Sequence, residues 1–158
     1  MKSIFDDHNY LLWRLISQTK NAMQKARARE LAFYDIKLRE AAVIMIIEAS
    51  GGMVNAYKIA RWTVTEPHTI SVLLNRMEAD GFIKRTGIII DKERTPRIEL
   101  TSKGRKAYEK IMIFESLNKV TEVLTEEEKT TLDSMLKKLR NEALKQIRLR
   151  AKLPFPPF

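Results

Sequence analysis

A chain of 158 residues is long enough to bury one compact core, and its 44% apolar content is typical of a globular protein rather than a disordered one. Its 29 Lys and Arg residues against 20 Asp and Glu give a net charge of +9, which favours an anionic partner: nucleic acid, an acidic membrane surface or an acidic protein. The absence of cysteine excludes a disulfide scaffold, a thiolate metal site and a thiol redox switch within this chain. Because no segment reaches the roughly 20 apolar residues of a membrane span and none resembles a signal peptide, we expect no membrane partner and a cytoplasmic location.

The first half of the chain is expected to be helical. Residues 7–31 contain no Gly or Pro and carry apolar residues at helical spacing, which predicts one long helix. A second helix is expected within residues 33–50, ended by Gly51 and Gly52. Asn55 is expected to cap a short third helix.

The stretch "TEPHTISVLLNRMEADG", residues 65–81, predicts a fourth helix, with Thr65 as its N-cap and Pro67 in its first turn. One side of this helix is apolar and is expected to face the core: Ile70, Leu73, Leu74 and Met77. The opposite side is small and polar, with no carboxylate before Glu78, and consists of His68, Val72, Asn75 and Ala79, flanked by Thr69, Ser71 and Arg76.

That polar side is unusual for a helix that only faces water, because solvated helices commonly mix both charges. A helix in the major groove of DNA has to avoid carboxylates near phosphates and needs donors for the base edges. An apolar tip such as Val72 can also meet a thymine methyl group. The composition therefore favours DNA contact, although a solvated face remains the alternative on this helix alone.

Two strands are expected next, "GFIKRTGIII" and "RIELTSKG", around the charged turn "DKERTP". Apolar residues alternate in both strands, as a half-buried hairpin requires: Ile88 and Ile90, then Ile98 and Leu100. The loop between the strands is expected to project Lys92, Arg94 and Arg97. A helix–turn–helix followed by a basic hairpin places one helix in the major groove and the hairpin, or wing, on the backbone or in the minor groove.

The runs "MEADGFIKR" and "DKERTPRIELTSKG" resemble the winged helix–turn–helix of the multiple-antibiotic-resistance regulator (MarR) family of prokaryotic repressors. That family typically shows "LExxGLIxR" at the end of its recognition helix, then a wing with an acidic residue and Arg, then "LTxxG". Arg94 stands six residues before Leu100, as the family's wing Arg does. Asp91 departs from the pattern, because it stands three residues before Arg94 rather than two.

The C-terminal third predicts two more helices. Thr101 is expected to cap one over residues 102–124, and "TEEE" from Thr125 forms a capping box that starts the other. Apolar residues of the last helix recur every three to four positions: Leu132, Leu136, Leu139, Ala143 and Ile147. In the resembling family such helices intertwine with those of a second subunit, whereas the residues alone also fit a helical subdomain of a monomer.

These observations predict a mainly α (α+β) fold: residues 1–32 a dimerisation helix, 33–104 the winged helix–turn–helix, and 105–158 the C-terminal dimerisation helices and the tail "LPFPPF". The expected function is a homodimeric, sequence-specific transcriptional regulator, a ligand-responsive repressor on a pseudo-palindromic operator. The alternative is an architectural DNA-binding or protein-interaction module. The residues expected to contact double-stranded DNA are Thr65, Pro67, His68, Thr69, Ser71, Val72, Asn75, Arg76, Lys92, Arg94 and Arg97.

The resemblance also implies a small, often aromatic effector bound between the dimer helices and the winged domain. Four aromatic residues are expected near that junction, without a pocket being assigned: Tyr10, Trp13, Phe33 and Tyr34. With two histidines lacking zinc-site spacing and no glycine-rich phosphate loop, the sequence predicts no enzyme, no metal site and no cofactor.

Overall fold

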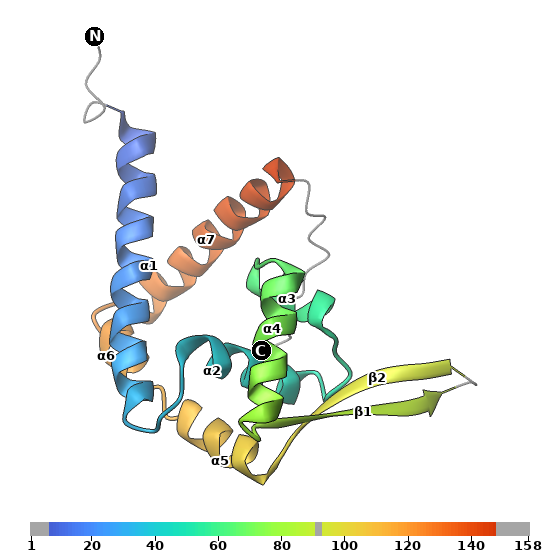
Figure 1. The fold of residues 1–158 in the computed structure, drawn as a ribbon. Coiled ribbons are helices and arrows are strands. Elements are labelled where there is room, and N and C mark those ends of the chain that lie inside the picture. The colour runs from blue at the N-terminus through green and yellow to red at the C-terminus, as the bar shows by residue number, and fades with distance from the viewer. Residues whose placement is uncertain (1–6, 91–92, 148–158) are drawn as a thin grey trace.

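The computed structural model describes residues 7–90 and 93–147, with the backbone alone over 88–90 and 93–96. The described elements follow the chain as a winged helix with long terminal helices (Figure 1): α1 (His8–Ala32), α2 (Leu38–Ala49), α3 (Ala56–Thr63), α4 (Pro67–Ala79), β1 (Ile83–Ile90), β2 (Glu93–Leu100), α5 (Ser102–Ile111), α6 (Glu115–Thr121) and α7 (Glu126–Gln146). The two strands form one antiparallel hairpin. The predicted mainly helical winged fold is confirmed.

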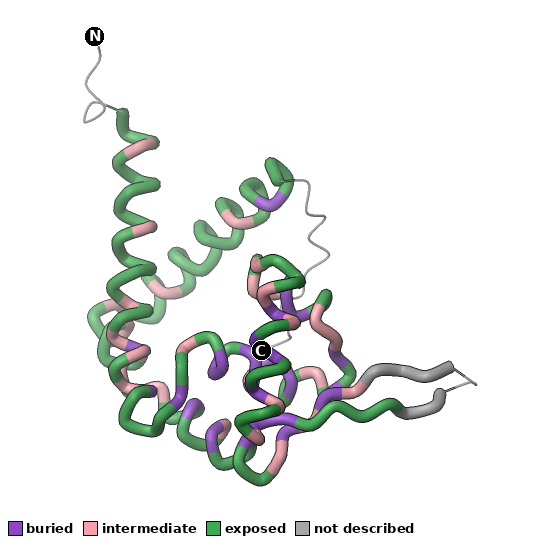
Figure 2. Tube along the Cα trace, in the orientation of Figure 1, coloured by how far each residue is buried: buried purple, intermediate pink, exposed green. Residues whose placement is uncertain are grey.

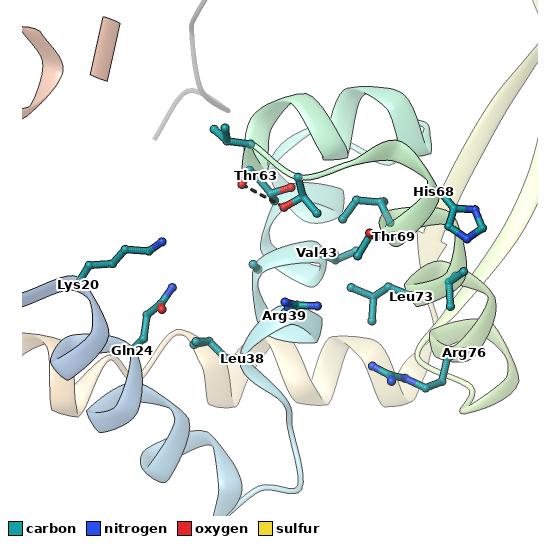
Figure 3. Close-up of a pocket in the computed structure, with 15 residues that line it drawn as sticks. Lys20, Gln24, Leu38, Arg39, Val43, Thr63, His68, Thr69, Leu73 and Arg76 are labelled. Atoms are coloured by element: carbon teal, nitrogen blue, oxygen red, sulfur yellow. Dashed lines mark hydrogen bonds between the residues drawn. The ribbon is translucent and has the colours of Figure 1, made fainter. Parts of the chain in front are cut away.

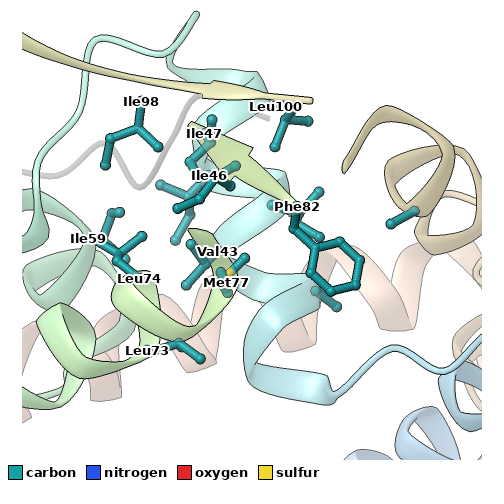
Figure 4. Packing of buried hydrophobic residues seen from close by; sticks show 14 of the residues in the cluster. Val43, Ile46, Ile47, Ile59, Leu73, Leu74, Met77, Phe82, Ile98 and Leu100 are labelled. Carbon is teal, nitrogen blue, oxygen red and sulfur yellow. The ribbon is translucent and has the colours of Figure 1, made fainter. Parts of the chain in front are cut away.

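The core lies where α2 meets α3, α4 and the base of the hairpin (Figure 4). The apolar side chains of α2 sit at its centre, and Ile44 and Val43 are fully buried. The predicted apolar side of α4 is confirmed, because all four of its members are buried: Ile70, Leu73, Leu74 and Met77. Burying side chains of this size stabilises a fold by roughly 1.5–3 kcal/mol each, so this face fixes which side of α4 remains outside.

Three predicted helix caps are confirmed. The side-chain oxygens of Asn55, Thr101 and Thr125 each accept a backbone N–H three residues later, which satisfies an otherwise unpaired donor at the helix start. The predicted cap of α4 is wrong. Its N-cap is Glu66, and the Thr65 hydroxyl instead donates to the carbonyl of Thr63 at 3.2 Å.

The hairpin is longer than predicted, because residues placed in the charged turn are paired. Pro96 lies opposite Gly87, and Glu93 lies opposite Ile90 in the last pair. The side chains of Ile88 and Ile90, and both Asp91 and Lys92, lie outside the described residues. At the other end of the hairpin, the predicted inward residues Ile98 and Leu100 are buried as expected.

The base of the hairpin is tied to the loop after α2. The Ile98 N–H donates to the carbonyl of Gly52 at 3.0 Å. Gly52 has a φ of +79°, and a Cβ there would lie 2.7 Å from the Ile98 carbonyl oxygen. Both the left-handed backbone and the close approach therefore require glycine at this position.

The helix predicted over residues 102–124 is broken in two. Phe114 adopts a left-handed φ of 53° between α5 and α6. The cause lies on α1, 85 residues away: the Glu30 carboxylate accepts the N–H groups of Glu115 and Ser116 at 3.0 Å each, and it also accepts the Ser116 hydroxyl. The buried Arg27 pairs with Glu30 at 2.7 Å and donates to the carbonyl of Ile111. This cluster stabilises a new helix start where the local sequence alone would continue the old helix.

Glu30 is expected to make the fold acid-sensitive. Desolvation raises the pKa of Glu30, but the hydrogen bonds from Ser116 and Arg27 outweigh it and lower the pKa to about 2. The ionised carboxylate therefore stabilises the folded state at any pH above 4.5, the ordinary pKa of a glutamate. This contribution to the free energy of unfolding, on the order of 2 kcal/mol, is lost as the pH falls from 4.5 toward 2. Urea unfolding at equal protein concentration should show that the parent has a larger free energy of unfolding than Glu30→Gln at pH 7. This difference should become smaller toward pH 3. A difference that is the same at both pH values would contradict this role.

The terminal helices are largely exposed in one chain, as the green tube over α1 and α7 shows (Figure 2), and many of their exposed residues are apolar. On α7 and at its C-cap the exposed apolar residues include the predicted stripe members Leu132, Leu136, Leu139 and Ile147. On α1 they include Leu11, Leu12, Trp13, Leu15 and Ile16. Among the helices of the described ranges, none is both long and apolar enough to cross a membrane. The tail "LPFPPF" lies outside the described residues.

Candidate nucleic-acid interface

The outward side of α4 is formed by short side chains. His68, Asn75 and Ala79 are exposed, and Val72 keeps 54% of its surface in solvent. These positions lie opposite the buried side, because successive residues turn by about 100° around a helix. Pro67 occupies the first turn, where its missing N–H breaks no helical bond. The outward side thus holds three of the residues predicted to contact DNA, His68, Val72 and Asn75.

Hydroxyl groups on both flanks of α4 are partly engaged. The Ser71 hydroxyl donates to the carbonyl of Pro67 at 3.0 Å, which leaves its oxygen lone pairs free to accept. Thr65 and Thr69 are half-buried and face the space between α4 and α2. These three predicted residues lie beside the outward side rather than at its centre.

The one acid predicted near this surface is turned away from it. The Glu78 carboxylate accepts the Arg85 N–H at 2.9 Å and lies 3.6 Å from the Arg85 guanidinium. Glu78 therefore ties the end of α4 to the first residues of β1, and its charge is balanced locally. Between the first turn of α4 and Glu78, the outward side carries no carboxylate; the exposed acid Glu66 precedes it as the N-cap.

The wing extends from the core beyond α4 (Figure 1). The backbone places Arg94 in β2, opposite Ile89 and one pair from the end of the described hairpin, rather than in a turn. Lys92 lies outside the described residues. The expectation that Arg97 projects from the loop is wrong, since Arg97 pairs with Thr86 in mid-hairpin.

Arg97 is held by an acid at the hairpin base. Its Nε lies 2.9 Å from the Glu99 carboxylate, which also pairs with the Lys84 ammonium at 2.9 Å. The hydrogen bond from Lys84, with the charges of Lys84 and Arg97, lowers the pKa of Glu99. The positive charge at the base of the wing is therefore partly neutralised. Arg94 lies further from the base, near the other end of β2.

A cleft of about 770 Å³ opens beside α4, between that helix and α1 and α2 (Figure 3). Basic and apolar side chains from all three helices line it, together with the turn before α4: Lys20, Gln24, Leu38, Arg39, Ala42, Val43, Thr63, Val64, Thr65, His68, Thr69, Ile70, Val72, Leu73 and Arg76. No Asp or Glu is among these lining residues. The cleft shares five lining residues with the set predicted to contact DNA: Thr65, His68, Thr69, Val72 and Arg76.

The cleft, and the residues of α1 and α2 that line it, were not predicted from the sequence. Lys20 and Arg39 belong to segments distant from α4 in the chain, and no local motif marks them. The aromatic residues expected near an effector are not among the described lining residues: Tyr10, Trp13, Phe33 and Tyr34. In the described part of the chain, no group of His, Asp or Glu residues is arranged to hold a metal ion.

No protein-family model and no curated protein sequence matches the chain. Solved structures do. The organohalide-sensing transcriptional regulator RdhR-CbdbA1625 is 28% identical; its ligand-free form covers 100% of this chain and 95% of that chain with a TM-score of 0.81, and its 2,4-dichlorophenol-bound form covers 97% and 96% with a TM-score of 0.80.

Two further neighbours share the fold at lower identity. A mutant of MarR from E. coli, complexed with operator DNA, is 20% identical over 87% of this chain and 99% of that chain, with a TM-score of 0.75. MepR from S. aureus, in complex with DNA, is 24% identical over 89% and 99%, with a TM-score of 0.72.

The fold and its neighbours define a winged helix–turn–helix transcription regulator, a class distinct from enzymes. Together with the "LTSKG" motif after the wing, this fold makes the chain similar to MarR-family transcriptional regulators.

Proposed function

We propose that the chain is a homodimeric repressor that binds a pseudo-palindromic DNA operator through α4 and the wing and releases it when a small molecule binds. The observation that carries this proposal is the outward side of α4, where His68, Val72 and Asn75 are exposed and the nearby acid Glu78 is balanced by Arg85. A narrow surface of donors without free carboxylate suits the major groove. The operator-bound state of the E. coli MarR mutant supports the same reading.

Specificity and affinity would come from different parts of this surface. Asn75 and His68 would reach base edges, and Val72 would meet a thymine methyl group. The N-terminal end of α4, with Thr65, Pro67, Thr69 and Ser71, would lie against the backbone, where contacts position the protein. On the wing, Lys92 and Arg94 would add charge at the backbone or minor groove. Arg97 of the wing and Arg76 of α4 are paired with Glu99 and Glu40, so they would contribute less charge.

A dimer would cover the apolar surface that one chain leaves exposed. Residues 1–32 and 105–158 would form the dimerisation region around a winged domain of residues 33–104. The exposed apolar residues of α1 and α7 support this division, because large apolar side chains gathered on two helices are typical of an interaction surface. Two-fold symmetry would place two α4 helices about one turn of DNA, roughly 10 base pairs, apart.

The cleft beside α4 is the proposed effector site. Lys20, Arg39 and Arg76 bring positive charge to its wall, next to apolar side chains such as Leu38 and Val43. That combination suits an amphipathic anion, for example a phenolate or an aromatic acid. RdhR-CbdbA1625, whose structure was solved with 2,4-dichlorophenol, supports an aromatic effector. Because the cleft borders α4, an occupant would alter how α4 is presented to DNA.

To test the proposal, the full chain is used to select DNA duplexes that it binds from a random library. Dissociation constants are then measured at one salt concentration for a selected duplex and for a duplex with the same bases in scrambled order. A regulator should prefer its site by about a thousandfold or more. Equal dissociation constants for the two duplexes would support the alternative, an architectural winged helix that binds DNA without sequence specificity.

A further inference from the structure

Arg76 of α4 is paired with a buried acid of α2. Its Nη2 lies 3.2 Å from the Glu40 Oε1, across a sequence separation of 36 residues. The Glu40 side chain is 2% exposed, whereas that of Arg76 is 49% exposed. The pair therefore joins the inside of the winged domain to the rim of the candidate DNA surface.

Glu40 is built into the start of α2. Its Oε2 accepts the Lys37 N–H at 3.0 Å, and the Lys37 ammonium lies 3.5 Å from Oε1. A carboxylate in the first turn is also stabilised by the helix dipole. Because removing a partner from a buried charge is costly, Glu40 holds Arg76 more firmly than a surface acid would.

The position of Arg76 on the helix supports a role other than base contact. Asn75 points outward, and Arg76, about 100° further round, lines the cleft on the side of α2. The buried apolar side of α4 sets which side of the helix faces outward, but apolar contacts are non-directional and do not single out one exact angle. An ion pair at the rim restrains the rotation of α4 about its axis. With a helix radius of about 5 Å, a turn of about 20° would move a side-chain tip by about 2 Å, enough to break hydrogen bonds to bases.

We infer that Arg76 is a positioning residue: through Glu40 it fixes the rotation of α4 against α2, and so sets sequence preference without contacting a phosphate. The inference rests on the proposed function, since it concerns how α4 reads DNA. A phosphate contact and a positioning role have different signatures. A lost phosphate contact lowers the salt dependence of binding by about one unit of slope on every duplex, while misplacement of α4 lowers affinity for the selected duplex alone.

The test compares the parent with Arg76→Gln, Glu40→Gln and the double variant on the selected and scrambled duplexes at several salt concentrations. The double variant leaves no unpaired buried charge at this pair, so it retains the fold even where a single variant does not; thermal unfolding checks this. Arg29→Gln, on exposed α1, removes the same charge elsewhere and should bind both duplexes as the parent does.

The expected result is about a tenfold loss of affinity for the selected duplex in both single variants and no further loss in the double variant, because the two residues act as one unit. Affinity for the scrambled duplex and the salt slope should stay unchanged. A slope lowered by about one unit on both duplexes in Arg76→Gln, with Glu40→Gln binding as the parent, would overturn the inference. A parent without preference for the selected duplex would overturn the proposed function itself, an outcome visible before any variant is measured.

Discussion

A Leu136→Glu, Leu139→Glu double variant is expected to sediment as an 18.4 kDa monomer at micromolar concentration, where the parent sediments at twice that mass. Leu136 and Leu139 are 43% and 47% exposed in one chain and stand on the same stripe of α7. At a two-fold interface the substitutions would bury four carboxylates, each at a cost of several kcal/mol. Losing the dimer also removes the simultaneous engagement of two half-sites, so operator affinity should fall by about a hundredfold or more.

Ser134→Glu is the control, because it adds a carboxylate to an exposed position on the other side of α7. It should leave the dimer and operator binding intact. Sedimentation equilibrium is the direct measurement. A parent that is monomeric, or a double variant that remains dimeric and binds as the parent does, would contradict the proposed interface.

Asn75→Ala and Arg94→Ala are expected to weaken DNA binding in different ways. Asn75 is exposed on the outward side of α4, so its loss should cost about 1–3 kcal/mol on the selected operator and little on a random duplex. Arg94 lies near the end of the described hairpin, so its loss should weaken both duplexes by similar factors and flatten the salt dependence by about one unit of slope. Asn21→Ala, on an exposed part of α1, should match the parent.

Titrations of each variant against both duplexes, at several salt concentrations, separate these outcomes. Full operator preference in Asn75→Ala would mean that α4 does not read bases through this residue. If Arg94→Ala binds DNA with the same salt dependence as the parent, Arg94 does not contact a phosphate and acts only within the wing.

Most features that depend on near neighbours in the chain were predictable, with the N-cap of α4 as an exception. Helical periodicity identified the buried side of α4, from Ile70 to Met77, and the caps at Asn55, Thr101 and Thr125 followed from side chains that reach backbone groups three residues on. The position of the wing followed from alternation at Ile98 and Leu100.

Features set by distant residues were not predictable in this way. The break at Phe114 depends on Glu30 of α1, which starts α6 from 85 residues away. The restraint on Arg76 depends on Glu40, and the cleft needs α1, α2 and α4 to be brought together. Periodicity and spacing describe one element at a time, whereas these features arise from charged side chains that meet only in the folded chain.

The central claim, that two copies of the chain present two α4 helices to one duplex, is tested most directly by hydroxyl-radical footprinting on the selected operator. Two protected segments related by a two-fold axis are expected, with centres about one helical turn, roughly 10 base pairs, apart, and with flanking protection from the wings. A single short protected segment at saturating protein would contradict it.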